Sequence, residues 1–169
     1  DEVYTVTHVQ AAQKGLELVF EPPTNGTVPA RGDFGKIKQV LINLIGNSLK
    51  FTPKGSIRIR ATEQAELGHY LIEVVDTGIG IAKDEMDLLF QPFSQARGAH
   101  ANSGGTGLGL VICREMARLL GGSINCLSEP GEGSVFHFTL PGATAVSATG
   151  KAEERPIAEG SSTPESTVD

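Results

Sequence analysis

One helix-like segment places two amides and one ammonium on a single face. Residues 34–51 read FGKIKQVLINLIGNSLKF, with apolar side chains around most of a helical circumference. Asn43, Asn47 and Lys50 are spaced i, i+4, i+7, and Gly46 lies on the same side. Amide oxygen is a hard ligand suited to Mg²⁺, and a lysine nearby reaches phosphate oxygens as a point charge. These residues predict a magnesium and phosphate site, the alternative being amides that bond backbone and a lysine that reaches solvent.

An acidic turn follows an apolar segment later in the chain. Residues 69–76 read HYLIEVVD, a predicted strand, and residues 77–81 continue as TGIGI. The Asp76 carboxylate can accept a hydrogen bond from the exocyclic amine of adenine, whereas the carbonyl of guanine is repelled there. Gly78 and Gly80 let backbone lie against a flat base, and Ile81 is assigned to the same base site. The alternative is an aspartate that only stabilises a glycine turn.

A glycine-rich stretch, SGGTGLGL at 103–110, comes directly before an amphipathic segment. Unpaired amides at the start of a helix favour a polyphosphate. The stretch has no lysine after its last glycine, as a P-loop requires, and lacks the Gly-x-Gly-x-x-Gly spacing of dinucleotide folds. The residues predicted to contact phosphate are Gly105, Thr106, Gly107, Leu108 and Gly109.

Alternating segments and turn residues predict the elements that position these groups. The predicted strands are 16–20, 56–62, 69–76, 123–128 and 134–140, and the predicted helices are 34–51 after an Asp33 cap, 83–89 and 108–120. A polar loop occupies 91–103. This order favours one layer of helices on a mixed or largely antiparallel sheet, and it lacks the regular alternation of a doubly wound fold.

Composition limits the remaining possibilities. The chain has 169 residues, of which 39% are hydrophobic, enough for one domain at 1–141. Residues 142–169 are rich in Ala, Ser, Thr, Glu and Pro, which predicts a disordered tail or interdomain linker. The net charge of −6 argues against a nucleic-acid partner. Cys113 and Cys126 lie in apolar stretches and are expected to be reduced core thiols. No apolar run is long enough to span a membrane. We therefore expect a cytoplasmic segment without membrane contact, an expectation that also holds for a membrane-anchored parent chain.

Four stretches taken together resemble a known family. In chain order, QVLINLIGNSLKFTPKG, DTGIGI, LFQPF and GGTGLGL are similar to the N, G1, F and G2 boxes in the ATP-binding catalytic domain of sensor histidine kinases. The resemblance covers roughly residues 32–141. It implies the Bergerat fold of the GHKL superfamily: a two-layer α/β sandwich with a mixed, mostly antiparallel sheet of about five strands, about three helices and a flexible ATP lid.

The resemblance also implies roles for individual residues. Asn47 matches the Mg²⁺ ligand, Asn43 its companion, Lys50 a phosphate contact and Asp76 the adenine-reading residue. Gly78 and Gly80 match the turn under the base, Phe90 and Phe93 match the aromatic residues beneath the lid, and residues 105–109 match the phosphate loop. One departure is Ala101, which stands where the family often has an arginine, so Arg97 and His100 are candidates for the γ-phosphate contact.

Asn43 bears on the expected reaction. Hydrolytic members similar to gyrase, Hsp90 and MutL carry a glutamate at this position, and an amide has no useful basicity for activating water. Phosphoryl transfer needs mainly positioning and charge neutralisation. We therefore expect a protein-histidine kinase domain for two-component signalling that uses ATP and Mg²⁺.

Its nucleophile is expected elsewhere in the parent protein. None of the chain's four histidines lies in the sequence context of a phospho-acceptor. The expected partners are the parent's own dimerisation and phospho-acceptor domain, in a homodimer, and a response regulator or receiver domain. No autophosphorylation is expected of the chain alone. The alternatives are a regulatory nucleotide-binding module without transfer activity, a hydrolytic ATPase of the same fold and, more distantly, a dinucleotide-binding oxidoreductase.

Overall fold

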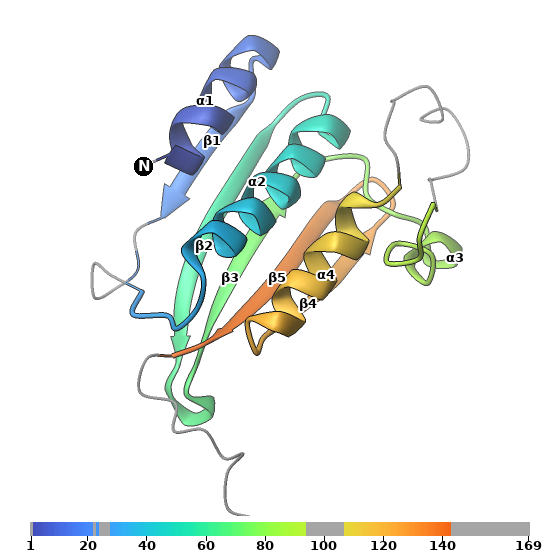
Figure 1. The fold of residues 1–169 in the computed structure, drawn as a ribbon. Coiled ribbons are helices and arrows are strands. Elements are labelled where there is room, and N and C mark those ends of the chain that lie inside the picture. The colour runs from blue at the N-terminus through green and yellow to red at the C-terminus, as the bar shows by residue number, and fades with distance from the viewer. Residues whose placement is uncertain (1, 22, 24–27, 94–106, 143–169) are drawn as a thin grey trace, which may run out of the picture.

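The structure, a computed structural model, describes residues 2–21, 23, 28–93 and 107–142. A five-stranded sheet carries α1, α2 and α4 on one face (Figure 1). The elements are α1 (Glu2–Lys14), β1 (Glu17–Glu21), α2 (Phe34–Phe51), β2 (Ser56–Gln64), the 3₁₀ turn η1 (Ala65–Leu67), β3 (His69–Asp76), α3 (Lys83–Met86), α4 (Gly109–Leu119), β4 (Ser123–Glu129) and β5 (Gly133–Pro141). The predicted two-layer α/β architecture with a mixed sheet is confirmed.

The sheet places the acidic turn at the end of its central strand. Its order is β1-β2-β3-β5-β4, in which β1 runs parallel to β2 and the other pairs are antiparallel. Asp76, the last residue of β3, lies opposite Ile57 of β2 and Ser134 of β5. The carboxylate is therefore flanked by a neighbouring strand on each side.

Helix α2 forms with its predicted bounds and lies between α1 and α4 (Figure 1). The Asp33 side chain accepts a hydrogen bond from the Lys36 backbone N–H at 3.2 Å, which caps the helix start. The helix ends at Thr52, whose N–H donates to the Ser48 carbonyl at 3.0 Å. Its buried residues, at intervals that match one side of a helix, are Val40, Leu44, Ile45, Ser48 and Leu49.

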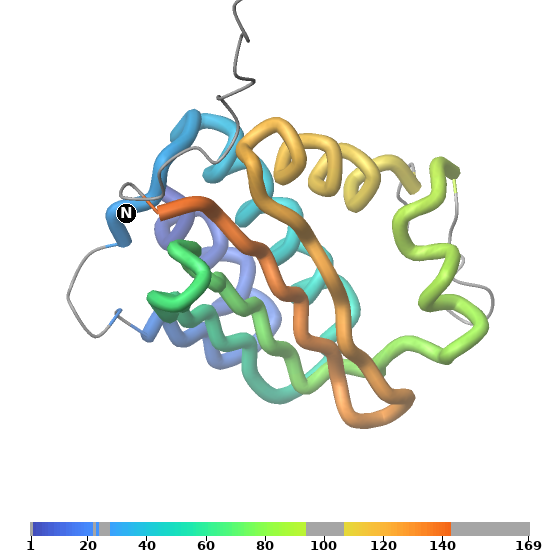
Figure 2. Tube along the Cα trace, turned by 90° about the horizontal axis from the view of Figure 1, so that it is seen from below, coloured from blue at the N-terminus to red at the C-terminus, as the bar shows by residue number. Residues whose placement is uncertain are grey.

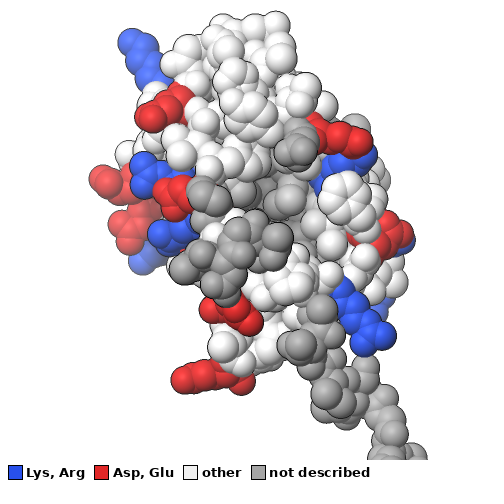
Figure 3. All heavy atoms as spheres, turned by 90° about the vertical axis from the view of Figure 1, so that its left-hand side faces the viewer, with Lys and Arg blue, Asp and Glu red and all other residues white. Residues whose placement is uncertain are grey.

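Helix α1 was not among the predicted elements. Its buried residues are Thr7 and Ala11, one polar and one small, so the segment has no stripe of large apolar side chains. Lys14 Nζ donates to the Leu49 carbonyl at 2.6 Å and so ties α1 to the last turn of α2. On the side of the molecule shown in Figure 3, basic and acidic side chains of the described residues are interspersed.

Some predicted segments differ or fall outside the description. Helix α3 is shorter than the predicted 83–89, and the chain around it lies beside the N-terminal end of α4 in both Figure 1 and Figure 2. The predicted lid beyond residue 93, including Arg97 and His100, and the predicted tail beyond residue 142 lie outside the described residues. None of the described helices combines the length and the apolar character required to cross a bilayer.

Candidate functional site

The Asp76 carboxylate is buried, at 5% exposure, and neutral donors surround it. Its Oδ1 accepts from the backbone N–H of Gly78 at 2.9 Å and from that of Ser134 at 3.2 Å. Its Oδ2 accepts from the Ser48 hydroxyl at 3.0 Å. A carboxylate offers about four acceptor sites. Because Oδ1 is already shared between two donors, Oδ2 is the oxygen with room for a further donor from a ligand.

Burial sets the electrostatics of this group. Desolvation raises the pKa of Asp76, while the hydrogen bonds from Gly78, Ser48 and Ser134 act in the opposite direction. On β4, burial and then the charge of Asp76 raise the pKa of the Cys126 thiol to about 12. Burial therefore destabilises the ionised form of Asp76, and only hydrogen bonds from neutral groups compensate for this cost.

The backbone of Gly78 packs closely against this carboxylate. A side chain there would place its Cβ 2.5 Å from the Phe51 carbonyl oxygen, 2.8 Å from Asp76 Oδ1 and 2.9 Å from Thr52 Oγ1. Real Cβ atoms do not approach so closely, so only glycine fits. The Thr52 hydroxyl, at 0% exposure, is the one buried side-chain polar atom among the described residues that lacks a hydrogen-bond partner.

Gly80 and Ile81 attach the same loop to the β4–β5 turn. Gly80 has a φ of +69°, and a Cβ there would lie 1.9 Å from the Glu129 carbonyl oxygen. The Ile81 N–H donates to Ser128 Oγ at 2.9 Å, and the Gly131 N–H donates to the Ile79 carbonyl at 2.7 Å. The approach of the Glu129 backbone is sufficient reason for glycine at position 80, independently of any base.

The predicted polar face of α2 is present, although its members differ in their contacts. Asn43, Asn47 and Lys50 are all half-buried. Asn43 Oδ1 accepts from Gln39 Nε2 at 3.0 Å, whereas the side chain of Asn47 forms no hydrogen bond with the described residues. Lys50 Nζ lies 4.9 Å from the centre of the Phe51 ring. A Cβ at Gly46 would meet no atom within 4 Å, so the space beside this glycine is open.

The glycine-rich stretch is described only in part. Gly105 and Thr106 lie outside the described residues. Gly107 has a φ of +69°, Leu108 is the residue before α4, and Gly109 begins that helix. Of the two predicted aromatic residues, Phe90 packs on the core with the Arg114 guanidinium 5.6 Å from its ring centre, while Phe93 is 76% exposed with a φ of +61°.

Comparison with known proteins identifies the family. Residues 32–144 match the family described as Histidine kinase-, DNA gyrase B-, and HSP90-like ATPase, which is more than half of the chain. The chain belongs to this family. It is also 40% identical over 133 residues to the Autoinducer 2 sensor kinase/phosphatase LuxQ of Vibrio parahaemolyticus, a match of 76% of this chain and 16% of LuxQ. The chain thus spans about a sixth of that sensor kinase.

Solved structures agree with this ATPase-family assignment. ShkA in complex with AMPPNP superposes with a TM-score of 0.71 at 30% identity, covering 83% of this chain and 28% of ShkA. The histidine kinase ThkA in complex with the response regulator TrrA superposes with a TM-score of 0.66 at 27% identity, covering 83% and 38% of the two chains. The chain is the ATPase-type domain of a sensor histidine kinase family, as the four motifs predicted.

The described residues fit the nucleotide that this ATPase family implies. Asp76 offers a buried acceptor, and the Thr52 hydroxyl has no hydrogen-bond partner among the described residues. A metal ion, in contrast, would find few protein ligands. Among the described residues, no group of three or more His, Cys, Asp or Glu side chains could hold an ion. A divalent cation would need an amide such as Asn47, with its other ligands from phosphate and water.

Three residues that line this site were missed by the sequence reasoning: Ser48, Thr52 and Ser134. Ser48 had a detectable signal, because a hydroxyl within the apolar face of α2 requires a partner. Thr52 was read only as part of a turn before proline. Ser134 contributes its backbone N–H, which any residue could supply, so its side-chain type carried no signal.

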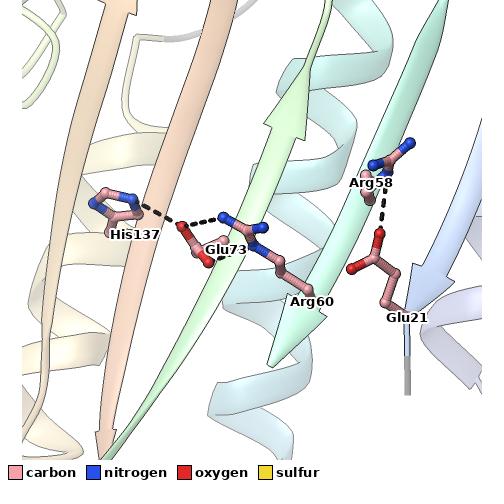
Figure 4. A network of polar contacts seen from close by, with 5 residues as sticks. All are labelled: Glu21, Arg58, Arg60, Glu73 and His137. Carbon is pink, nitrogen blue, oxygen red and sulfur yellow. Dashed lines mark hydrogen bonds and ion pairs between the residues drawn. The ribbon is translucent and has the colours of Figure 1, made fainter. Parts of the chain in front are cut away.

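A second carboxylate of β3 lies on the other face of the sheet. Figure 4 shows Glu73 between Arg60 of β2 and His137 of β5, on the face away from α2. Arg60 Nε is 2.5 Å from Glu73 Oε2, and His137 Nε2 is 3.2 Å from Glu73 Oε1. The hydrogen bond from Arg60 holds the pKa of Glu73 below its usual value. The guanidinium and the imidazole occupy both oxygens of Glu73, which is why we assign it no ligand.

Proposed function

We propose that this domain binds Mg·ATP between α2, the loop after β3 and the start of α4, and donates the γ-phosphoryl group to a histidine of a separate dimerisation and phospho-acceptor domain. The observation that carries the proposal is the buried, neutrally bonded carboxylate of Asp76 beside the polar face of α2. An acceptor at Oδ2 suits the adenine amine, and the α2 face suits phosphate and cation.

The α2 face supports a division of roles. We assign Asn47 as the magnesium ligand, because its amide has no competing bond among the described residues. We assign Lys50 to the phosphates and Asn43, whose oxygen is engaged by Gln39, to a supporting position. Bound magnesium would supply neutralisation of phosphate charge. Backbone amides of residues 105–109, the last of which is the first residue of α4, would contact the same phosphates.

Asn43 supports phosphoryl transfer over ATP hydrolysis, because the amide at this position of α2 cannot deprotonate water. A neutral imidazole of an acceptor domain needs little help from a base, so positioning and charge neutralisation suffice. A response regulator or receiver domain is the proposed next partner, an assignment supported by the ThkA–TrrA complex. The parent chain is proposed to be a homodimer.

The test is incubation with γ-labelled ATP, with and without a matching acceptor domain. We expect label on the acceptor histidine only when that domain is present, and little phosphate release from the chain alone. Strong labelling of the isolated chain contradicts the proposal. Nucleotide binding without any transfer favours a regulatory module, and rapid phosphate release favours a hydrolytic ATPase.

Asn47→Ala tests the metal role directly. Loss of one such contact to charge in a phosphoryl-transfer site is expected to slow transfer by roughly 10²- to 10³-fold. The magnesium dependence of ATP affinity should weaken with it. Asn125→Ala is the matched control, because Asn125 is an exposed amide on β4 and should leave both quantities unchanged.

A further inference from the structure

We propose that Ser128 is a positioning residue for the adenine side of the nucleotide site, where its hydroxyl holds the backbone of Ile81. This inference rests on the proposed function, since it adds a residue to the same site. Ser128 is the last residue but one of β4, and it lies outside the four motifs. We assign it no contact with the nucleotide, so its effect on binding passes through the loop after β3.

The Ser128 hydroxyl uses all of its hydrogen-bonding capacity. It donates to the Gly133 carbonyl at 2.7 Å and accepts from the Ile81 N–H at 2.9 Å. Ser134 Oγ lies 3.0 Å from Ser128 Oγ. A hydroxyl has one proton and two lone pairs, so with its proton given to Gly133 it takes the Ser134 bond as an acceptor. One side chain thus joins the loop after β3 to the β4–β5 hairpin.

Two hydrogen bonds between described residues join this hairpin to residues 79–81. The Gly131 N–H donates to the Ile79 carbonyl at 2.7 Å, and the Ile81 N–H donates to the Ser128 hydroxyl. The first bond uses backbone atoms only, whereas the second needs an acceptor on the side chain of residue 128. The residue type at this position therefore decides whether one hydrogen bond or two hold the loop on the hairpin.

The anchored residue, Ile81, is one of those predicted to contact the adenine ring. It is half-buried and packs against the hydrophobic core. Between it and Asp76 the chain contains Gly78 and Gly80, and glycine restricts the backbone less than any other residue. A hydrogen bond at the Ile81 N–H therefore fixes the far end of a loop whose near end is the buried carboxylate.

Loss of the Ser128 hydroxyl should weaken nucleotide binding without removing any group that contacts the ligand. In Ser128→Ala the side chain of residue 128 offers the Ile81 N–H no acceptor, so the loop is less ordered before the nucleotide binds. The nucleotide must then order the loop, which reduces its apparent affinity. Because the adenine ring is common to ATP and ADP, both should lose affinity by the same factor. Loss of a γ-phosphate contact would instead weaken ATP alone.

The experiment measures ATP and ADP affinities of the full 169-residue chain by calorimetry, and hydrogen exchange of the Ile81 amide by NMR in the ligand-free chain. We expect Ser128→Ala to weaken both nucleotides and to speed exchange at Ile81, each by about fivefold. Ser128→Thr retains a hydroxyl and should stay within about twofold of wild type. Ser123→Ala is the matched control, because it breaks a hydroxyl pair with Thr139 at 2.9 Å elsewhere on the same two strands. It should leave both affinities and the Ile81 exchange within about twofold of wild type.

Unchanged nucleotide affinity of Ser128→Ala, with faster exchange at Ile81, overturns the proposal and leaves Ser128 a structural role only. A loss for ATP alone overturns it as well, as does an equal loss in Ser123→Ala or Ser128→Thr. If Ser128→Ala does not fold, wild type decides: an Ile81 amide that exchanges as fast as an unprotected amide overturns the proposal. Absence of ATP binding by wild type refutes the proposed function itself. Because exchange is measured without nucleotide, the two failures are distinguishable.

Discussion

Glu73 and Asp76 are two carboxylates three residues apart on β3, and their surroundings are opposite. Glu73 lies on the open face of the sheet between Arg60 and His137 (Figure 4). Asp76 lies under α2 and is bonded by a hydroxyl and two backbone amides. The hydrogen bond from Arg60 lowers the pKa of Glu73, whereas desolvation raises the pKa of Asp76. The Arg60 cation balances the charge of Glu73. Asp76 receives hydrogen bonds from neutral donors only, so its carboxylate can still accept one from a ligand.

The strand itself creates this difference. Successive side chains of a strand point to opposite faces, so residues separated by an odd number of positions cannot share a face. On the open face, β2 places the Arg60 guanidinium on one side of Glu73, and β5 places the His137 imidazole on the other. On the helix face, Asp76 meets Ser48 of α2, a residue type that can donate a hydrogen bond but carries no charge.

The largest expected effect is that of Asp76→Asn on ATP binding. Asparagine can keep the bonds from Gly78 and Ser134 through its oxygen and can donate to Ser48 with its amide. That amide would then face the adenine amine, donor against donor. A hydrogen bond to a charged group contributes about 1.5 to 3 kcal/mol, so we expect affinity to fall roughly 10- to 100-fold in calorimetry.

Glu73→Gln is the control for this change, because it neutralises a carboxylate on the same strand that we assign no ligand. Its ATP affinity should stay within about twofold of wild type. The unfolding free energy of Asp76→Asn should change by less than about 1 kcal/mol, since the lost charge was costly to bury. Unchanged ATP affinity of Asp76→Asn would remove Asp76 from the base site.

The sequence predicted the sheet and α2 well because their signals are local. The alternation of 56–62, the apolar run of 69–76 and the Asp33 cap before a periodic segment each specify one element. Helix α1 was not predicted, because its buried residues are Thr7 and Ala11 and its sequence therefore shows almost no hydrophobic periodicity. It packs against β1 and α2, and the contacts with α2 join segments far apart in the chain, which leave no local pattern.

The carboxylate and the amides of the candidate site were predicted from the sequence, and its hydroxyl residues were missed. Asp76 and Asn47 are recognisable because carboxylates and amides are unusual next to apolar runs. Thr52 and Ser48 matter through their position at the end of α2, which only the fold reveals. Gly80 illustrates a third case: the glycine was predicted, but its observed contact is with the Glu129 backbone, which comes from a distant hairpin.

The next largest effect is on the stability of the fold, and here Glu73 is expected to matter more than Asp76. Glu73→Gln removes the charge that pairs with Arg60, leaving the guanidinium, itself about half exposed, without its partner. We expect the free energy of unfolding to fall by about 1 to 2 kcal/mol, between the values for exposed and buried pairs. Urea denaturation measures it, and Arg118→Gln is the control, because Arg118 pairs with Glu115 on the exposed surface of α4. A loss no larger than that of Arg118→Gln would show that Glu73 is not held by its charge.

The smallest expected effect is a pH dependence with opposite signs at the two residues. A lowered pKa means that ionised Glu73 stabilises the fold above the ordinary value of 4.5, and this contribution is lost as pH falls through the lowered pKa. A raised pKa means that ionised Asp76 costs stability, and this cost disappears as pH falls through a pKa above 3.8. The two contributions partly cancel in acid unfolding, so unfolding alone cannot separate them.

ATP binding separates the two carboxylates, because only Asp76 must be ionised to accept the adenine amine. As pH falls towards its raised pKa, affinity should fall by about two- to threefold while the chain is still folded, since at most one proton is taken up. Calorimetry at a series of pH values, corrected for protonation of ATP itself, measures this slope. Asp76→Asn should flatten it, and Glu73→Gln should leave it as in the wild type. A slope that persists in Asp76→Asn would place the titrating group elsewhere and end the contrast between the two carboxylates.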